Sequence, residues 1–239
     1  MRDQAGMMIK KSLERAVEIA RELERRKSTN RLLDYKPYDY QMKFHNSNAT
    51  QRLLMAGNRV GKSLSGAMEM AIHLTGKYPD WWEGRKFGRP IRAWAGGVSN
   101  ETTRDVCQKE LVGQPDDPSA KGTGSLPLDD IGETVRKAGV PNAMNSLVVR
   151  HITGGWSRLG FKAYEMGREK WMGEQVDVIW LDEEPPASIY SQALTRTADK
   201  GGSVYMTFTP EQGMTEIIAQ FINDIKKGQE MIQAGWDDA

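Results

Sequence analysis

The sequence is poor in the residues that build sulfur and imidazole metal sites. Its 239 residues include one cysteine, Cys107, and three histidines, His45, His73 and His151. A single cysteine excludes an internal disulfide framework and a thiolate metal cluster, and it fits a reducing compartment. Three widely separated histidines argue against a zinc site.

Long hydrophobic runs and a strong net charge are also missing. No apolar run approaches the roughly 18 residues needed to cross a bilayer, and the N-terminus lacks the layout of a secretory signal. We therefore expect no membrane partner. The net charge is +1, so a nucleic-acid-binding surface would have to be a local patch. With 38% hydrophobic and 27% charged residues, the composition is that of a folded globular protein.

From residue 52 onward, short apolar runs alternate with helical segments, as in a parallel sheet flanked by helices. We predict an N-terminal helical arm over residues 1–36, followed by one α/β domain over 37–239 with a doubly wound, mostly parallel sheet. Residues 113–128 are rich in Gly, Pro, Asp and Ser, which predicts a long surface loop. The predicted strands are 52–56, 91–98, 146–152, 176–181, 203–208 and 230–234, and the predicted helices are 62–76, 101–112, 129–138, 188–197 and 214–226.

The predicted arm centres on residues 7–27, whose apolar residues recur at steps of three and four as in an amphipathic helix. Residues 1–36 carry ten Lys and Arg against six Asp and Glu. We favour a helix that packs on the domain through its apolar stripe. The alternative is an arm that contacts DNA or a neighbouring subunit.

Residues 56–63 read AGNRVGKS, between a predicted strand and a predicted helix. They match the phosphate-binding pattern G-x-x-x-x-G-K-[ST], except that Ala56 takes the first glycine position. Lys62 would contact the β- and γ-phosphates of a nucleotide, and Ser63 would bind Mg²⁺. The simpler alternative is a glycine-rich turn before a helix. The backbone that would surround the phosphates is that of Gly57, Asn58, Arg59, Val60 and Gly61.

The predicted strand at 176–181 is apolar and runs into three acidic residues. Asp182 could hold Mg²⁺ through water, and Glu183 could activate the attacking water. Glu184 leaves the identity of the base open, because neighbouring charges shift one another's pKa. Beside a phosphate loop, this pattern indicates an ATPase that activates water.

Two further segments point to nucleotide contacts. Thr207 and Thr209 end the next strand, where helicase-like motors sense the γ-phosphate; ordinary strand formers are the alternative. Gln41 stands 21 positions before Lys62, and its amide offers a donor and an acceptor that match the adenine edge. Tyr38 could stack on the ring. A glutamine among aromatic residues is weak support taken alone.

Together these motifs resemble the large terminase subunit of headful-packaging tailed bacteriophages, from about Tyr38 to the C-terminus. The matching segments lie at 37–41, 55–63, 73–76, 180–186, 194–197 and 207–210. The resemblance implies a RecA-like ATPase that uses ATP and Mg²⁺ to pump double-stranded DNA into a procapsid. Its partners would be the portal ring and the small terminase subunit, in the host cytoplasm and transiently on the procapsid. It further implies a homo-oligomeric ring when docked and a monomer in isolation, with Gln41 on adenine and residues 207–209 coupling hydrolysis to movement.

The chain departs from this family at the arginine of the phosphate loop. Many members carry an arginine where this chain has Asn58, so the charge on the γ-phosphate must be met from elsewhere. We predict that Arg168 acts in trans on a neighbouring subunit, with Arg104 as the next candidate. The alternative is a surface arginine that pairs with Glu165 or Glu169.

The chain also ends at Ala239, where family members continue into an RNase-H-like nuclease domain. We therefore expect the ATPase half alone, without nuclease activity. One rival interpretation is a RecA-like half of a superfamily 2 helicase. Another is a scaffold with an inactive nucleotide site, which the intact Lys62, Ser63, Asp182 and Glu183 argue against. The basic segment 85–92 is either a DNA contact or a solvated turn.

Overall fold

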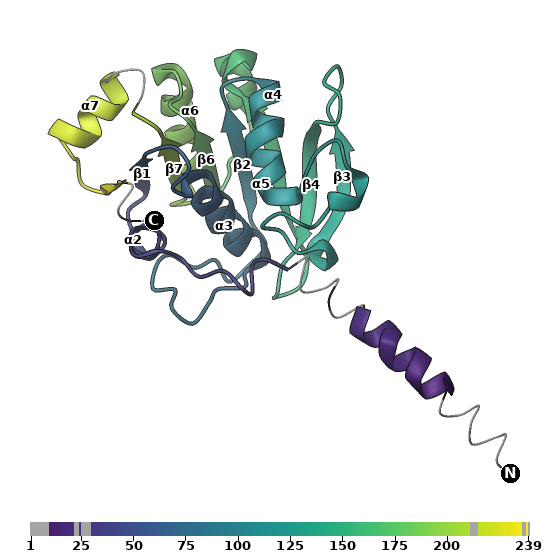
Figure 1. Ribbon diagram of the computed structural model, residues 1–239. Coiled ribbons are helices and arrows are strands. Elements are labelled where there is room, and N and C mark those ends of the chain that lie inside the picture. The colour runs from purple at the N-terminus through teal and green to yellow at the C-terminus, as the bar shows by residue number, and fades with distance from the viewer. Residues whose placement is uncertain (1–9, 22–23, 25–29, 211–214, 236–237, 239) are drawn as a thin grey trace, which may run out of the picture.

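The computed structural model describes residues 10–21, 24, 30–210, 215–235 and 238. An eight-stranded sheet with the order β3-β4-β5-β2-β6-β7-β1-β8 forms its centre (Figure 1). Neighbouring strands are parallel from β5 to β8, whereas β4 runs antiparallel to both β3 and β5. The prediction of an α/β fold with a mostly parallel sheet is confirmed. The strands are β1 (Gln51–Ala56), β2 (Arg92–Gly97), β3 (Ile131–Arg136), β4 (Met144–Arg150), β5 (Trp156–Ala163), β6 (Val178–Asp182), β7 (Ser203–Phe208) and β8 (Gln229–Ala234).

Helices cover both faces of the sheet, and each face has its own core. On one face, α3 lies over Val178, Trp180 and Tyr205; on the other, α6 and α7 cover Ile179 and Leu181. Successive residues of β6 thus enter opposite cores, as expected for a strand buried on both faces. The helices are α2 (Asp39–Asn46), α3 (Lys62–Thr75), α4 (Asn100–Thr102), α5 (Lys109–Val112), α6 (Ala187–Ala198) and α7 (Glu216–Asn223), with a π-helix at Thr103–Gln108 and short 3₁₀ helices at Pro118–Ala120, Leu128–Asp130, Tyr164–Met166 and Arg168–Trp171.

The helix predicted at 129–138 is wrong, because this segment contains β3. Its residues include helix formers such as Glu133 and Lys137, but pairing with β4 decides the conformation at the sheet edge. The sequence reading also missed α2 and β5. In β5, Ser157, Leu159 and Phe161 are buried while residues between them are more exposed, a period of two that was present in the sequence.

The segment 113–128 is not simply an exposed loop. Backbone hydrogen bonds tie it to the end of α5, from Gly122 N to Val112 O at 2.7 Å and from Leu126 N to Leu111 O at 2.8 Å. The Leu126 side chain is fully buried. These bonds turn a Gly- and Pro-rich connection into a packed part of the domain.

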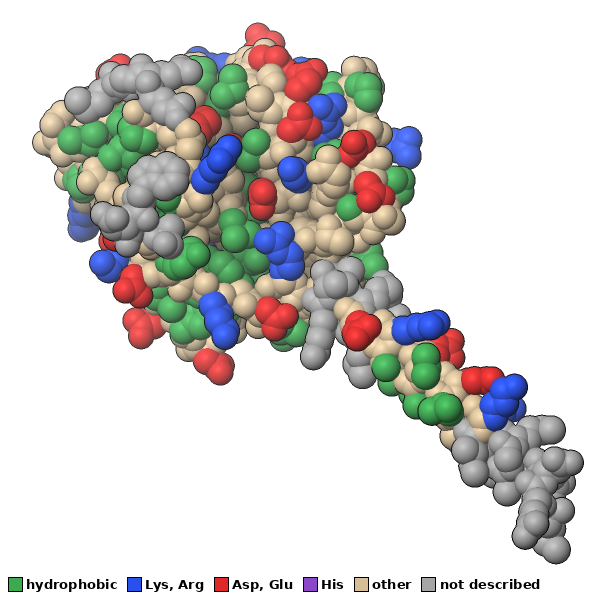
Figure 2. All heavy atoms as spheres, viewed as in Figure 1, with side chains coloured by type: hydrophobic (Ala, Val, Ile, Leu, Met, Phe, Trp, Pro, Cys, Tyr) green, Lys and Arg blue, Asp and Glu red, His purple; other side chains and the backbone are tan. Residues whose placement is uncertain are grey.

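The N-terminal helix is described over residues 10–21, and most of the rest of the predicted 7–27 lies outside the described residues. Leu13 and Val17 of its apolar stripe are 64% and 45% exposed. Figure 1 shows this helix projecting from the domain, and Figure 2 shows uncovered apolar side chains on it. The expected packing of this stripe on the domain is therefore wrong for the described part. None of the helices in the described ranges combines the length and apolar character needed to cross a bilayer.

Candidate active site

The phosphate-loop motif joins the C-terminal end of β1 to the first turn of α3. Gly61 precedes Lys62, the first residue of α3, and its φ of 91° is a conformation that favours glycine. Ala56, by contrast, is the last residue of β1, with ordinary strand geometry. A side chain is therefore tolerated where the motif usually has its first glycine. Arg59 also has a positive φ, 64°, so the loop turns sharply before the helix.

The loop lies opposite the acidic end of β6, although 119 residues separate Ser63 from Asp182. Lys62 Nζ lies 3.0 Å from Glu183 Oε1, and Ser63 Oγ lies 3.4 Å from Asp182 Oδ1. Strand β7 runs between β1 and β6, so all three strands end at one edge of the sheet. In open α/β sheets, ligands bind at the carboxyl ends of the strands, and this arrangement follows that rule.

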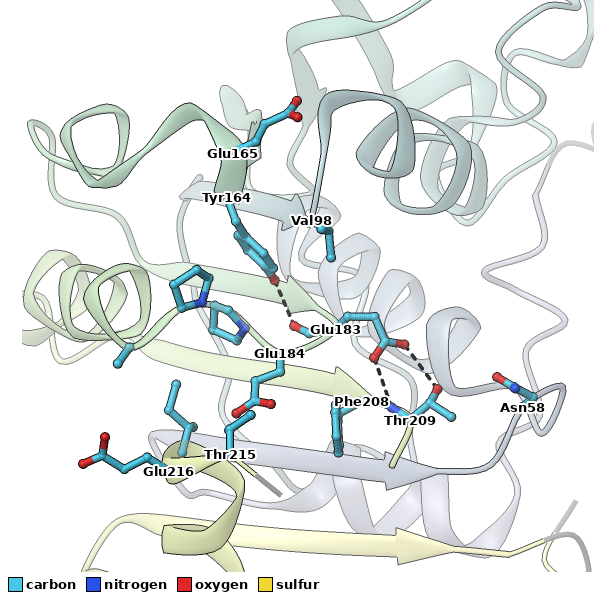
Figure 3. Close-up of a pocket in the computed structure, with 14 residues that line it drawn as sticks. Asn58, Val98, Tyr164, Glu165, Glu183, Glu184, Phe208, Thr209, Thr215 and Glu216 are labelled. Carbon is cyan, nitrogen blue, oxygen red and sulfur yellow. Dashed lines mark hydrogen bonds between the residues drawn. The ribbon is translucent and has the colours of Figure 1, made fainter. Parts of the chain in front are cut away.

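The two threonines of β7 and its exit contact the two acids separately. Thr207 donates a hydrogen bond to Asp182 Oδ1 at 2.8 Å and accepts one from Trp180 Nε1 at 2.8 Å. Thr209 donates its backbone N–H and its hydroxyl to the Glu183 carboxylate, each at 3.2 Å (Figure 3). The structure therefore places both predicted threonines beside the predicted acids.

Asp182 and Ser63 supply oxygen atoms of the kind that Mg²⁺ prefers. Burial raises the pKa of Asp182 to about 6, against the opposing effects of Lys62 and the Thr207 hydrogen bond. A nearby cation would favour the charged form of this carboxyl group and so offset the effect of burial. The residues present thus fit a hydrated magnesium ion.

A tyrosine that the sequence analysis did not single out holds the backbone of this acidic turn. The Tyr164 hydroxyl lies 3.0 Å from the carbonyl oxygens of both Asp182 and Glu183 and 3.3 Å from that of Gly96. Glu183 itself has a φ of 62°, which is rare for a residue with a side chain. No motif in the sequence marked Tyr164, because it follows β5, a strand that the sequence reading missed.

Glu184 lies on another side of the turn. Its Oε1 is buried without a hydrogen-bond partner among the described residues, and burial raises the pKa of its carboxyl group. Figure 3 shows the Glu184 side chain directed toward Thr215, in a pocket of about 730 Å³, while the Glu183 carboxylate faces Thr209. The geometry thus brings Glu183, and not Glu184, to the phosphate loop.

The predicted adenine contacts, Tyr38 and Gln41, lie beside the phosphate loop. Both polar atoms of the Gln41 amide, however, already form hydrogen bonds within the protein. Gln41 Oε1 accepts from the Tyr38 N–H at 2.9 Å and from the Tyr35 hydroxyl at 3.3 Å, while Nε2 donates to Gly61 O at 3.3 Å. Tyr38 is 51% exposed and stacks on Tyr40, whose hydroxyl donates to Val60 O. This segment therefore supports the phosphate loop directly, and adenine recognition stays a prediction.

The candidate arginines lie outside this cluster. Arg168 is exposed in the 3₁₀ helix Arg168–Trp171 and bonds neither Glu165 nor Glu169 within the described part of the chain. Instead, its Nη2 and Nε donate to the Gln192 amide oxygen at 3.0 and 3.1 Å, in the amide orientation that satisfies both groups. Arg104 pairs with Asp105 at 2.7 Å.

The basic segment 85–92 is partly neutralised by nearby acids. Arg89 pairs with the buried Asp177 at 2.6 Å, and Arg92 pairs with Glu174 at 2.7 Å. Arg85 donates to Gly202 O at 3.4 Å. A DNA contact at this turn stays a prediction.

The fold matches solved structures of phage terminases. It aligns with the large terminase ATPase domain of Thermus phage P74-26 at a TM-score of 0.58 and 19% identity, over 87% of this chain and 84% of that one. It also aligns with the large terminase of another thermophilic bacteriophage, solved in complex with ADP, at a TM-score of 0.57 and 12% identity. That match covers 84% of this chain and 46% of the other. The expected RecA-like fold of these ATPase domains is confirmed.

Sequence comparisons give the same family. The chain is 36% identical to the terminase large subunit of Salmonella phage P22, over 93% of this chain and 48% of that protein. It is 28% identical to the large subunit of Enterobacteria phage LP7, over 60% of this chain and 30% of that protein. The chain thus spans about half or less of the length of these relatives. Residues 53–239 match the family model of the T4likevirus-type terminase large subunit, N-terminal part, and the chain belongs to this family of terminase large subunits.

Proposed function

We propose that this chain is the ATP-hydrolysing motor region of a viral DNA-packaging terminase. The observation that carries the proposal is the meeting of the phosphate loop with the acidic turn, through Lys62 with Glu183 and Ser63 with Asp182. This arrangement supports the proposal because phosphate binding, magnesium binding and water activation would all need such groups at one sheet edge.

In this proposal, the backbone and the side chains of the site divide three tasks: phosphate binding, activation of water and metal binding. The backbone N–H groups of residues 57–61 and the Lys62 ammonium bind and orient the ATP phosphates. Glu183 accepts a proton from the attacking water, and Thr209 holds its carboxylate in place. Ser63 and Asp182 would hold Mg²⁺, which would neutralise the charge that develops on the phosphates.

Membership of the terminase family supports a proposal for the partners. Hydrolysis would translocate double-stranded DNA into a procapsid through the portal ring, with the small terminase subunit as a further partner. The motor would work as a homo-oligomeric ring in the host cytoplasm, docked transiently on the procapsid, and the isolated chain would be a monomer. Arg168 would serve the ATP site of the neighbouring subunit in that ring.

The test is steady-state ATP hydrolysis by the purified 239-residue chain. We expect slow phosphate release that requires Mg²⁺ and stops in EDTA. We also expect no DNA cleavage with Mg²⁺ or Mn²⁺. The same protein without any phosphate release, with ATP binding intact, would overturn the proposal. Plasmid cleavage that a substitution in this chain abolishes would overturn the expectation about the nuclease.

A further inference from the structure

The turn that carries Glu183 contacts a tyrosine, Tyr164, that has no task in the proposed chemistry. We propose that Tyr164 is a positioning residue for the base: its hydroxyl keeps the backbone at Asp182 and Glu183 in the shape that directs the Glu183 carboxylate to the phosphate loop. The inference rests on the proposed ATPase function and adds a residue to its machinery.

The contact is well placed for this task. The phenol oxygen lies 3.0 Å from two consecutive carbonyl oxygens, those of Asp182 and Glu183, and 3.3 Å from that of Gly96. Figure 3 shows the hydroxyl reaching the backbone of Glu183 from the side opposite Thr209. The single hydroxyl proton lies within reach of the carbonyl oxygens of both acids and can be donated to either, which ties both residues to one buried donor.

The conformation that this donor supports is a strained one. Glu183 is among three non-glycine residues with positive φ in the described ranges, the others being Arg59 and Asn142. Such a conformation is unfavourable for a residue with a side chain, and it persists only where surrounding contacts impose it. At Glu183, the N–H donates to Thr207 O at 2.8 Å and the carbonyl accepts from Tyr164.

Relaxation of this turn toward an ordinary extended φ would rotate the Glu183 side chain. The carboxylate would then leave the Thr209 N–H and hydroxyl that hold it in place. A displacement of about 1 Å at a catalytic group can cost on the order of 100-fold in rate. The Tyr164 hydroxyl therefore acts on the reaction through Glu183 and touches no reacting atom.

Tyr164 is itself firmly anchored, so it can impose this geometry. It is 6% exposed, and its ring lies 5.9 Å from that of the fully buried Trp171. The Trp171 indole in turn donates to Ala163 O at 3.2 Å. Removing the hydroxyl alone should leave this packing intact, because phenylalanine keeps the ring.

The experiment compares Tyr164→Phe with the parent chain in steady-state ATP hydrolysis. We expect kcat to fall about 10- to 100-fold, while KM and the dissociation constant of a fluorescent ATP analogue change less than about threefold. The matched control is Tyr190→Phe, which also removes a buried phenol oxygen, bonded to Gln51 Oε1 at 2.9 Å at the other end of β1. Tyr190→Phe should retain kcat within about twofold.

A double-mutant cycle with Glu183→Gln separates positioning from general loss of structure. If Tyr164 acts through Glu183, adding Tyr164→Phe to Glu183→Gln should cause almost no further loss of kcat. Equal fractional losses in both backgrounds would overturn the inference, as would a Tyr164→Phe chain with the parental rate. A parent chain without any ATP hydrolysis would instead count against the proposed function itself.

Discussion

The ammonium of Lys62 lies 3.0 Å from the carboxylate of Glu183, so the proposed phosphate-binding lysine and the proposed base form an ion pair. An ATP γ-phosphate that bound Lys62 would compete with Glu183 for the same charge. Because Thr209 also holds the carboxylate through two hydrogen bonds, Glu183 would remain in place when Lys62 turned to the phosphate. In the proposed mechanism, nucleotide binding would therefore break the ion pair with Lys62 and leave the Glu183 carboxylate held by Thr209.

Replacing Glu183 by glutamine should separate binding from chemistry. Glu183→Gln keeps Lys62, Ser63 and Asp182, so we expect Mg-ATP binding to persist while kcat falls about 10²- to 10⁴-fold, the usual contribution of a positioned base. Phosphate release and equilibrium binding of a labelled nucleotide measure the two effects. Glu184→Gln is the matched control and should hydrolyse ATP at close to the parental rate. The reverse pattern would assign the base to Glu184.

Glu69 should be a stability residue of the domain. This fully buried carboxylate of α3 lies 2.5 Å from Arg52 Nη2, 2.7 Å from His45 Nδ1 and 3.1 Å from His73 Nε2. Glu69→Gln would leave the Arg52 guanidinium buried without its counter-charge, which typically costs about 3–5 kcal/mol. Urea denaturation measures this loss.

The control for Glu69 is the exposed pair of Arg92 with Glu174. Both side chains are about half exposed, so Glu174→Gln should cost less than about 1 kcal/mol. Similar losses in the two variants would contradict the special role of the buried cluster.

The same cluster predicts that acid destabilises the fold. Burial alone would raise the pKa of Glu69, but Arg52 and hydrogen bonds from His45 and His73 outweigh it and hold that pKa well below 4.5. The carboxylate therefore stabilises the native state above about pH 4.5, and this contribution is lost as the pH falls further. Burial lowers the pKa of His73 from 6.5, so the unfolded chain takes up that proton first and stability already declines below about pH 6.5.

Melting temperatures between pH 8 and pH 3.5 check this order. We expect the melting temperature of the parent chain to fall below about pH 6.5, because of His73, and to fall further below about pH 4.5, because of Glu69. The difference in melting temperature between the parent and Glu69→Gln should be constant above about pH 5. It should narrow below about pH 4.5, where Glu69 takes up a proton in the unfolded parent while it is still ionised in the folded one. A difference that stays constant down to the lowest pH would show that the pKa of Glu69 is not lowered in the folded chain.

Arg168 should matter in the assembled motor and not in the isolated chain. Its side chain bonds Gln192 of its own chain and is exposed, so a neighbouring ATP site can reach it. Arginines that engage a γ-phosphate in this way contribute about 10³- to 10⁵-fold in rate. We expect Arg168→Ala to leave the slow basal hydrolysis within about twofold and to abolish most hydrolysis and DNA packaging on procapsids.

Mixed motors provide the decisive measurement for Arg168. Combining Arg168→Ala with Glu183→Gln subunits should restore some ATP hydrolysis, because some interfaces then pair an intact base with an intact arginine. Lys170→Ala, which removes a cation from the same 3₁₀ helix, is the control and should package normally. Parental packaging by Arg168→Ala alone would exclude a trans role at this residue.

The chemistry of the phosphate loop and the acidic strand could be predicted from the sequence because each is a local pattern. The positive φ of Gly61 favours glycine, and Lys62 begins a helix directly after it. Strand β6 is an apolar run that ends in acidic residues. The alternation of apolar runs and helices likewise predicts the parallel part of the sheet, since strands buried on both faces must be nearly all apolar. These features depend on neighbouring residues in the chain, so one sequence suffices to find them.

Contacts between distant segments decided the rest. The pairing of β3 with β4 overrode the helix formers at 129–138, and only the folded chain brings Tyr164 to the carbonyls of the acidic turn. The choice between Glu183 and Glu184 also depends on the backbone at Glu183, whose φ is positive. The Glu183 carboxylate lies beside Lys62, whereas that of Glu184 points toward Thr215 in the pocket that both acids line. Glu183 and Glu184 are the same amino acid in nearly the same sequence context. Their different placements therefore arise from backbone geometry, which contacts between distant segments impose.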